Sequence, residues 1–432
     1  MSPNPEDLSG TDDYDGEPLF VKLLWFDVKA ALGELPGWER AFHIFFLLGP
    51  FFLLIERTPA DIWLSLIALI FAARAFVRRD FSWLRVVWVR LAFLFWMACL
   101  TSAAMSPLPS YSLGEAFAWF RFPLFAMAVS FWLASDRRVL HAMLITTAIG
   151  MMIMCGILLL EMLIEGQKGG RLTWPYGDLV PGGYLAKAGM PAFVIMVALI
   201  FGRNRVLAAS ATATTIINFG VSFLAGERVN FLLRFFSAAL ALFAWRFHKV
   251  RASMVLVFCG IGIATAFLLG PENAGRLTHG LYEGISTGFQ SDYFSVMGGG
   301  YAVFEQAMTL GIGPGNYRML AEGMLADMPH LRADNHPHNF YLQLLAETGI
   351  VGTITGIFFI VSIIWTCFMA RSKEPGNIVV TTAFIVPLGM FWPIATTADF
   401  FGQWNNIFMW SAVAIALACA RAGSKDNSQK VA

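Results

Sequence analysis

The sequence predicts an all-α polytopic membrane protein with about twelve transmembrane helices and one large helical loop. Of the 432 residues, 57% are hydrophobic and only 14% are charged, and the mean hydropathy is +0.63. Soluble chains carry roughly 25% charged residues. The apolar residues gather in runs such as Ile350 to Met369, and a helix needs about 20 such residues to cross a bilayer. We therefore expect these segments to be solvated by lipid.

Charge and cysteine content exclude other classes. The 30 Lys and Arg residues are balanced by 29 Asp and Glu, which gives no general case for nucleic-acid binding. Every cysteine lies in an apolar run, so we expect neither a disulfide framework nor a metal cluster. The cysteines are Cys99, Cys155, Cys259, Cys367 and Cys419.

The N-terminal stretch from Ser2 to Glu17 is acidic and polar, without the basic region and cleavage site of a signal peptide. We expect insertion to begin with the first internal span. From Pro18 to Leu35, apolar and charged residues alternate over a stretch too short and too charged to span. This pattern predicts an interfacial helix on the cytoplasmic face, with a disordered leader as the alternative.

Apolar runs of about 20 residues predict the spans in order. Their approximate limits are 41–56, 60–77, 88–105, 115–134, 139–164, 184–202, 206–225, 229–247, 252–270, 350–370, 378–397 and 403–421. The predicted organisation is a leader (1–40), nine spans (41–270), a large periplasmic loop (271–349), three further spans (350–421) and a cytoplasmic tail (422–432).

The distribution of basic residues predicts the orientation. With a cytoplasmic N-terminus, every inner loop and the tail carry Lys or Arg, while the outer loops are sparse in basic residues for their length. The inner set is Arg74, Arg78, Arg79, Arg85, Arg90, Arg137, Arg138, Arg203, Arg205, Arg246, Lys249, Arg251, Arg371, Lys373, Arg421, Lys425 and Lys430. Both termini are therefore expected in the cytoplasm.

One outer loop is exceptionally long, because Pro271 to Gly349 contains no clean span. Loops longer than about 12–15 residues are usually functional or disordered. Apolar spacing predicts helices over Asp292–Leu310 and Asn316–Asp327, so we expect a folded helical cap over the periplasmic mouth of the bundle.

Three histidines, His330, His336 and His338, fall together near the end of this loop. Pro337 suits the first turn of a helix, which would place His338 at a helix start. An imidazole can be neutral at pH 7 and accept a proton. A histidine that merely caps the helix is an equal alternative for His338 and the better interpretation for His330. The His-x-His spacing alone is a poor zinc signature.

Basic residues on the outer side form a second group of candidates. Arginine donates two parallel hydrogen bonds to a phosphate, and a charge at bilayer depth usually pairs or lines a polar cavity. The alternatives are snorkelling, or pairing with Glu227, Glu115 or Asp61, which is the stronger interpretation for Arg234. The group comprises Arg228 in a Gly226-Glu227-Arg228 turn, Arg234, Arg121, Arg171, Lys187 and Arg276.

Glycines form a third signal, in the run Gly311-Ile312-Gly313-Pro314-Gly315-Asn316-Tyr317. Such a loop before a helix can hold an anion, although a plain turn is the simpler interpretation.

This run, the stretch from His338 to Gly349 (His-Asn-Phe-Tyr-Leu-Gln-Leu-Leu-Ala-Glu-Thr-Gly) and the Gly226-Glu227-Arg228 turn together resemble the O-antigen ligase and polymerase superfamily. The resemblance implies a metal-independent, cofactor-free glycosyltransferase of the all-helical C type in the bacterial inner membrane. Its donor is a glycan on undecaprenyl diphosphate, its acceptor is lipid A-core or another glycan, and its partners include membrane lipids.

The resemblance also implies roles for residues. His338, in the His-Asn motif with Asn339, is the implied base, and His336 is a second candidate. Arg228 and Arg276 are implied to bind the diphosphate. Arg171, Lys187 and Arg121 are further candidates for holding phosphate or acidic sugar. Arginines would stabilise charge on the departing phosphate, the histidine would deprotonate the acceptor, and in-line attack would invert the donor carbon.

Two other interpretations remain open. Within the enzyme class, an O-antigen or exopolysaccharide polymerase or a protein O-glycosylase would use similar chemistry, and the single large loop favours a ligase. A transporter or flippase also fits twelve spans with intramembrane arginines, but it predicts internal repeats and broken helices near mid-membrane. No repeat stands out, and most of the unusual polar residues lie at the outer edge.

Overall fold

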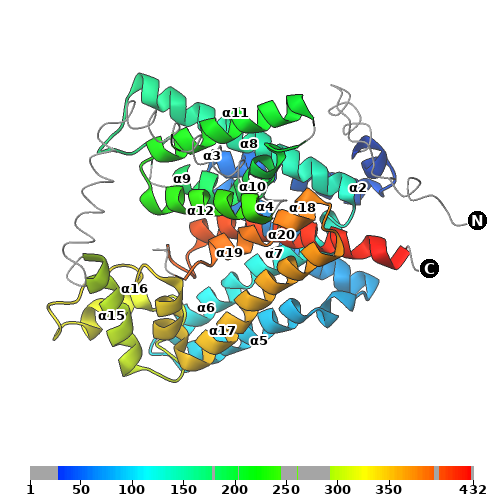
Figure 1. The fold of residues 1–432 in the computed structure, drawn as a ribbon. Coiled ribbons are helices and arrows are strands. Elements are labelled where there is room, and N and C mark those ends of the chain that lie inside the picture. The colour runs from blue at the N-terminus through cyan, green and yellow to red at the C-terminus, as the bar shows by residue number, and fades with distance from the viewer. Residues whose placement is uncertain are drawn as a thin grey trace, which may run out of the picture.

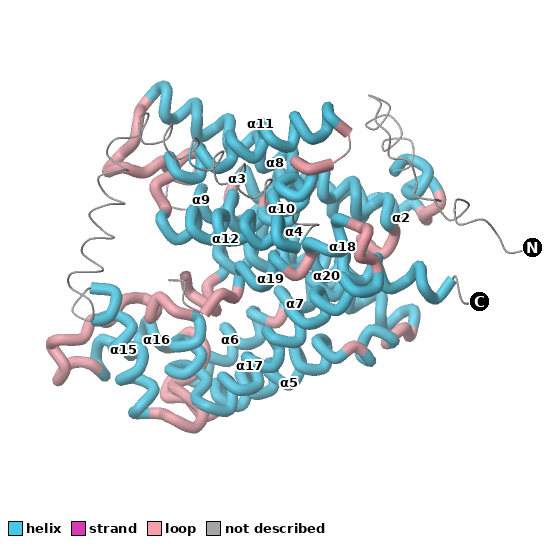
Figure 2. The backbone as a smooth tube through the Cα atoms, in the orientation of Figure 1, coloured by secondary structure: helices cyan, strands magenta, loops and turns pink. Residues whose placement is uncertain are grey.

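The computed structural model describes residues 28–177, 181–202, 204–244, 260, 292–393 and 398–429. Every regular element in these residues is helical (Figures 1 and 2). The elements are α2 (Gly37–Leu47), α3 (Gly49–Ile55), α4 (Arg57–Arg78), η2 (Ser82–Arg85), α5 (Val87–Ala104), α6 (Pro109–Trp119), α7 (Arg121–Ala128), η3 (Val129–Leu133), α8 (Arg137–Ile164), α9 (Pro181–Gly183), η4 (Tyr184–Ala188), α10 (Met190–Leu199), α11 (Arg205–Leu224), α12 (Arg228–Ala244), α15 (Asp292–Gln306), α16 (Tyr317–Met324), α17 (Phe340–Lys373), α18 (Ile378–Thr382), α19 (Ile385–Met390) and α20 (Gln403–Gln429).

The membrane character predicted from the sequence is confirmed. Seven helices are long and apolar enough to cross a membrane, or up to nine if two bent helix pairs each form one span. Two shorter apolar helices cover 229–242 and 378–390. Each predicted span coincides with one of these helices or pairs except 252–270, which apart from Gly260 lies outside the described residues. The count of twelve spans therefore stays a prediction.

Two predicted spans are bent rather than straight. Gly37–Leu47 and Gly49–Ile55 meet at 48°, and Pro181–Ala188 and Met190–Leu199 meet at 60°. In each pair the second helix has a proline in its first turn, Pro50 and Pro191. A proline there lacks the N–H that would continue the preceding helix. Continuous apolar runs do not reveal such bends.

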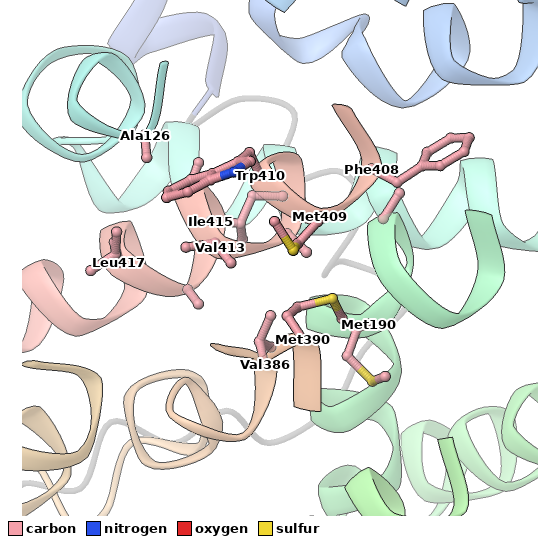
Figure 3. Close-up of a cluster of buried hydrophobic side chains, with 14 of the residues drawn as sticks. Ala126, Met190, Val386, Met390, Phe408, Met409, Trp410, Val413, Ile415 and Leu417 are labelled. Atoms are coloured by element: carbon pink, nitrogen blue, oxygen red, sulfur yellow. The ribbon is translucent and has the colours of Figure 1, made fainter. Parts of the chain in front are cut away.

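Helix α20 lies at the centre of the bundle. In its most apolar 18-residue stretch, 89% of the residues are buried, and the helix packs against α17, α7, α19 and α8. Figure 3 shows Trp410 and neighbouring α20 side chains among Ala126, Met190 and Met390, which come from three other helices. The packing of this apolar core sets the position of α20, and with it the position of the polar side chains Asn405 and Asn406 in its first turn.

Helices α15 and α16 form a compact unit at one end of the molecule, away from the C-terminal end of α20 (Figure 1). The predicted helix over Asp292–Leu310 corresponds to α15, and the one over Asn316–Asp327 corresponds to α16. Of the predicted interfacial helix, only 28–35 lies within the described residues, and 28–33 is helical.

Candidate functional site

The histidine segment, residues 330–339, lies against α15 and has no helix of its own. The amide of Arg332 donates to the Ser295 carbonyl at 3.4 Å. The helix meets the segment at consecutive glycines. A Cβ on Gly299 would lie 2.8 Å from the Arg332 carbonyl oxygen, and one on Gly300 would lie 2.5 Å from Pro337 Cβ. The missing side chains therefore allow the segment to pack directly on the helix backbone.

His338 lies near the end of this segment and pairs with a carboxylate. Its Nε2 is 3.2 Å from Asp334 Oδ2, and Arg332 Nε donates to the other carboxylate oxygen at 2.9 Å. The His336 ring packs against the His338 ring with centroids 4.4 Å apart. The φ of His338 is +53°, in the left-handed region that non-glycine residues seldom adopt. One third of the His338 side chain stays exposed, so a substrate can reach it.

Helix α17 begins later than the sequence indicates. The prediction that Pro337 opens the helix and that His338 sits at its start is wrong. The helix begins at Phe340, and Asn339 is its N-cap. The Asn339 side-chain oxygen accepts from the amides of the second and third helical residues at 3.0 and 3.2 Å, as is common for asparagine at this position. His338 therefore lies outside the helix, free of helical backbone geometry.

A short segment, 391–393, connects the histidine motif to the helix that follows the arginine turn. Asn339 Nδ2 donates to the carbonyl of residue 393 at 2.9 Å. On the other side, the Phe236 ring packs on the tryptophan ring of the same segment, with centroids 4.5 Å apart. Phe236 lies on α12, which begins at Arg228. The histidine motif and α12, the helix that begins at the arginine turn, thus contact one common segment.

The backbone at Gly226-Glu227-Arg228 forms a tight turn before α12. The φ of Gly226 is +80°, and a Cβ there would lie 2.2 Å from the Gly170 carbonyl oxygen and 3.0 Å from Arg171 Cγ. The structure thus places Arg171 directly beside the turn. The side chain of Arg228 and all of Arg276 lie outside the described residues.

Lys187 belongs to a polar group near this turn. Its Nζ donates to Asn405 Oδ1 near the start of α20, and the Glu227 carboxylate interacts with it electrostatically. Glu227 in turn accepts from Asn230 and approaches Gly182 so closely that a Cβ there would lie 3.0 Å from its carboxyl carbon. Lys187, a candidate from the sequence, therefore belongs to a group of polar side chains, with Glu227, Asn230 and Asn405, that lies between α9, α12 and α20.

Two arginines have structural partners. Arg121 forms an ion pair with Asp61 at 3.1 Å, which is the pairing alternative left open by the sequence. Arg234 is fully buried and donates to the Leu185 carbonyl and, at 3.1 Å, to Asn218 Oδ1. The Arg121 guanidinium is therefore held by its ion pair with α4. Arg234 stabilises the Leu185 carbonyl, next to the bend between η4 and α10.

The glycine loop does hold an acidic side chain, but that side chain belongs to the chain itself. The amides of Tyr317 and Gly315 donate to the buried Glu347 carboxylate, the former at 2.8 Å. The amide of Gly313 donates to the Glu347 carbonyl at 2.8 Å. The two halves of the family-like signature, residues 311–317 and 338–349, thus bind one another.

A second polar group extends from Glu347 to the loop that precedes α20. Gln343 Nε2 lies 3.0 Å from Glu347 Oε2 and 2.6 Å from Asp399 Oδ1, and Asp399 forms an ion pair with Arg318 of α16. Burial opposes the charge on Arg318, but the nearby carboxylates outweigh it and raise the pKa of the guanidinium. Burial, together with Glu347 and Asp334, raises the pKa of the Tyr317 hydroxyl.

Several of these residues were not singled out from the sequence. Gln343 and Glu347 entered only as members of the 338–349 stretch, and the sequence assigns no role to Asp334 or Asp399. One signal was available: the three glycines 298–300 inside a predicted helix each cost about 1 kcal/mol relative to alanine and so indicate close packing. Within the described residues, no three metal-ligating side chains converge.

Comparison with known families agrees with the motifs. Residues 213–357 match the family model described as O-antigen ligase. The matched region includes the arginine turn, the glycine loop and the histidine segment. The match confirms the predicted resemblance to the O-antigen ligase superfamily, and it supports glycosyl transfer of the ligase or polymerase type by an integral membrane protein. No curated protein matches the chain.

Proposed function

Starting from the O-antigen ligase match, we propose that this protein transfers a glycan from undecaprenyl diphosphate to an acceptor hydroxyl on the periplasmic face of the inner membrane. The observation that carries the proposal is the shared contact of Asn339 and Phe236 with segment 391–393. This contact links the histidine motif to the helix that begins at the arginine turn, which supports a single site for both.

The proposed reaction is a single displacement. The acceptor oxygen attacks carbon C1 of the donor sugar, the bond from C1 to the diphosphate oxygen breaks, and undecaprenyl diphosphate leaves with the bonding electrons. His338 takes the acceptor proton during attack, an effect worth roughly 10²–10⁴ in rate. Because attack and departure are in line, the configuration at C1 inverts. No metal ion or cofactor takes part.

We assign the stabilisation of the leaving group to basic side chains. Negative charge grows on the departing phosphate oxygen, and a guanidinium in a partly dry site stabilises such charge strongly. Arg228 and Arg276 are proposed to bind the diphosphate. Arg171, which packs against Gly226, and Lys187, which interacts with Glu227, lie beside the same turn and are proposed to extend the anion site. Arg121 is left out because Asp61 already pairs with it.

The proposed membrane orientation follows the basic residues. The inner loops inferred from the Lys and Arg bias put the end formed by α15 and α16 in the periplasm and the two termini in the cytoplasm. Donor lipid would lie between helices with its diphosphate at the periplasmic end. A thiol reagent that does not cross the membrane should therefore label a cysteine placed at exposed Glu322 in intact spheroplasts, and absence of labelling would invert the orientation.

We propose lipid A-core as the acceptor, which makes the enzyme an O-antigen ligase. A polymerase would use a second undecaprenyl-linked glycan instead, through the same chemistry. The lipopolysaccharide banding of a deletion strain separates them. Loss of all capped molecules supports the ligase, whereas a core bearing one repeat supports the polymerase.

The catalytic proposal is tested by His338→Ala with His330→Ala as its matched control. His330 belongs to the same segment and has an exposed side chain. Purified protein in liposomes with donor and acceptor should lose roughly 10²–10⁴ in transfer rate for His338→Ala and little for the control. Transfer by His338→Ala at the control rate would refute the base assignment. Arg228→Lys should weaken transfer, because lysine lacks the planar fork that binds phosphate through two hydrogen bonds.

A further inference from the structure

We propose that Asp334 is a positioning residue for His338, holding the imidazole in one orientation and one tautomer. This inference rests on the proposed function, because it gives the base of that reaction a partner. It assigns a role to a residue that neither the motif nor the family match singles out.

The geometry of the pair is the first argument. Asp334 Oδ2 lies 3.2 Å from His338 Nε2, within hydrogen-bond distance. The other carboxylate oxygen accepts from Arg332 Nε at 2.9 Å, so the carboxylate is held from both sides. The three side chains form a chain that ends on the imidazole.

The backbone supplies a second, independent argument. Residues four apart face one another as a matter of course on a helix, but Asp334 and His338 lie in a segment without helical structure. Their meeting depends on the positive φ of His338 and on the packing of Pro337 against Gly300. The backbone path is thus specific, and it brings these two side chains together.

The tautomer follows from the chemistry of the partners. An ionised carboxylate only accepts hydrogen bonds, so the Nε2 facing Asp334 carries the proton. The lone pair of a neutral His338 is then on Nδ1. As the ring gains positive charge, the nearby carboxylate stabilises it, as the aspartate does in serine protease triads.

The competing explanation is a surface ion pair. Arg332 and Asp334 alone would stabilise the segment without acting on the imidazole, and exposed pairs of this kind contribute little. A structural role and a positioning role differ in what they change. Loss of structure lowers the amount of folded protein or weakens substrate binding, whereas loss of positioning lowers the rate of the chemical step.

The experiment compares Asp334→Asn with Asp327→Asn, a matched change at an exposed residue seven positions earlier. Transfer is measured in liposomes with labelled undecaprenyl-diphosphate glycan. Asp334→Asn keeps the size of the side chain but removes its charge and can turn an N–H toward Nε2. We expect kcat to fall roughly 10- to 100-fold, less than the roughly 10²–10⁴ that a general base itself contributes, with the KM for the donor unchanged.

A double variant makes the test specific to His338. If Asp334 acts through the imidazole, Asp334→Asn should cost no further activity in the His338→Ala background. An undiminished kcat in Asp334→Asn would overturn the inference. So would a parallel rise in KM, a loss of folded protein, or a full additional loss in the double variant. Full activity of His338→Ala would instead contradict the assignment of His338 as the base, on which the inference rests.

Discussion

Gly300 gives the sharpest view of how the fold positions the histidine segment. In Gly300→Ala, the new Cβ would lie 2.5 Å from Pro337 Cβ and 3.6 Å from Leu342 Cβ. Two carbons in contact need about 3.5–4.0 Å, so Pro337 would have to move by about 1–1.5 Å, carrying its neighbour His338 with it. A misplacement of about 1 Å can cost roughly 10²-fold in rate, and we expect a loss of that order.

Stability should change much less than activity. Alanine gains about 1 kcal/mol over glycine within a helix, and overpacking costs about 1–3 kcal/mol, so the two effects largely offset one another. The matched control is Gly323→Ala in α16, where a Cβ meets nothing within 4 Å. The assay is glycan transfer by protein in liposomes, beside thermal unfolding in detergent. Wild-type transfer by Gly300→Ala would refute the idea that α15 positions the imidazole.

Three further predictions concern the surroundings of the site. Glu347→Ala leaves buried donors without an acceptor, and each such donor costs about 1–3 kcal/mol. The thermal unfolding temperature of this variant should therefore drop, whereas the exposed control Glu322→Ala should match wild type. Equal stability of the two variants would contradict the network. Asn339→Ala removes a helix cap worth about 1 kcal/mol and the contact to residue 393, so both stability and glycan transfer should fall. If neither changes, the proposed connection between the histidine motif and segment 391–393 is refuted. Arg121→Ala and Asp61→Ala should destabilise the protein similarly and non-additively while the KM for the donor stays unchanged; a KM raised only in Arg121→Ala would return that arginine to the diphosphate site.

The sequence predicted the fold class and the helix positions well, because a bilayer demands long apolar runs that are visible without any structure. It did not predict where helices bend, since a proline in a first turn suits a straight helix start as well as a break. The exact start of α17 was also missed. Both Asn339 and Pro337 are residues that favour a helix start. In the structure Asn339 caps the helix, and Pro337 lies before it, packed against Gly300.

The candidate site could be predicted only in part. Arg228 and His338 stand out by residue type and motif, but partners remote in sequence do not. The sequence offers Asp61 only as one of three possible acidic partners for Arg121 and the other outer arginines, and nothing local indicates that the glycine loop holds the Glu347 side chain. The Asp334 pair is close in sequence, yet it depends on an unusual backbone conformation at His338 that side-chain patterns do not encode.

The most direct test of the account is a cryo-EM structure with undecaprenyl-diphosphate glycan bound. A base within hydrogen-bond distance of the attacking hydroxyl, and that hydroxyl within reach of C1, together require the His338 imidazole to lie within about 6–7 Å of the donor C1. We predict that spacing, with the diphosphate contacting the Arg228 guanidinium at the end formed by α15 and α16. A diphosphate bound at the opposite end of the bundle, or one remote from His338, would contradict the account.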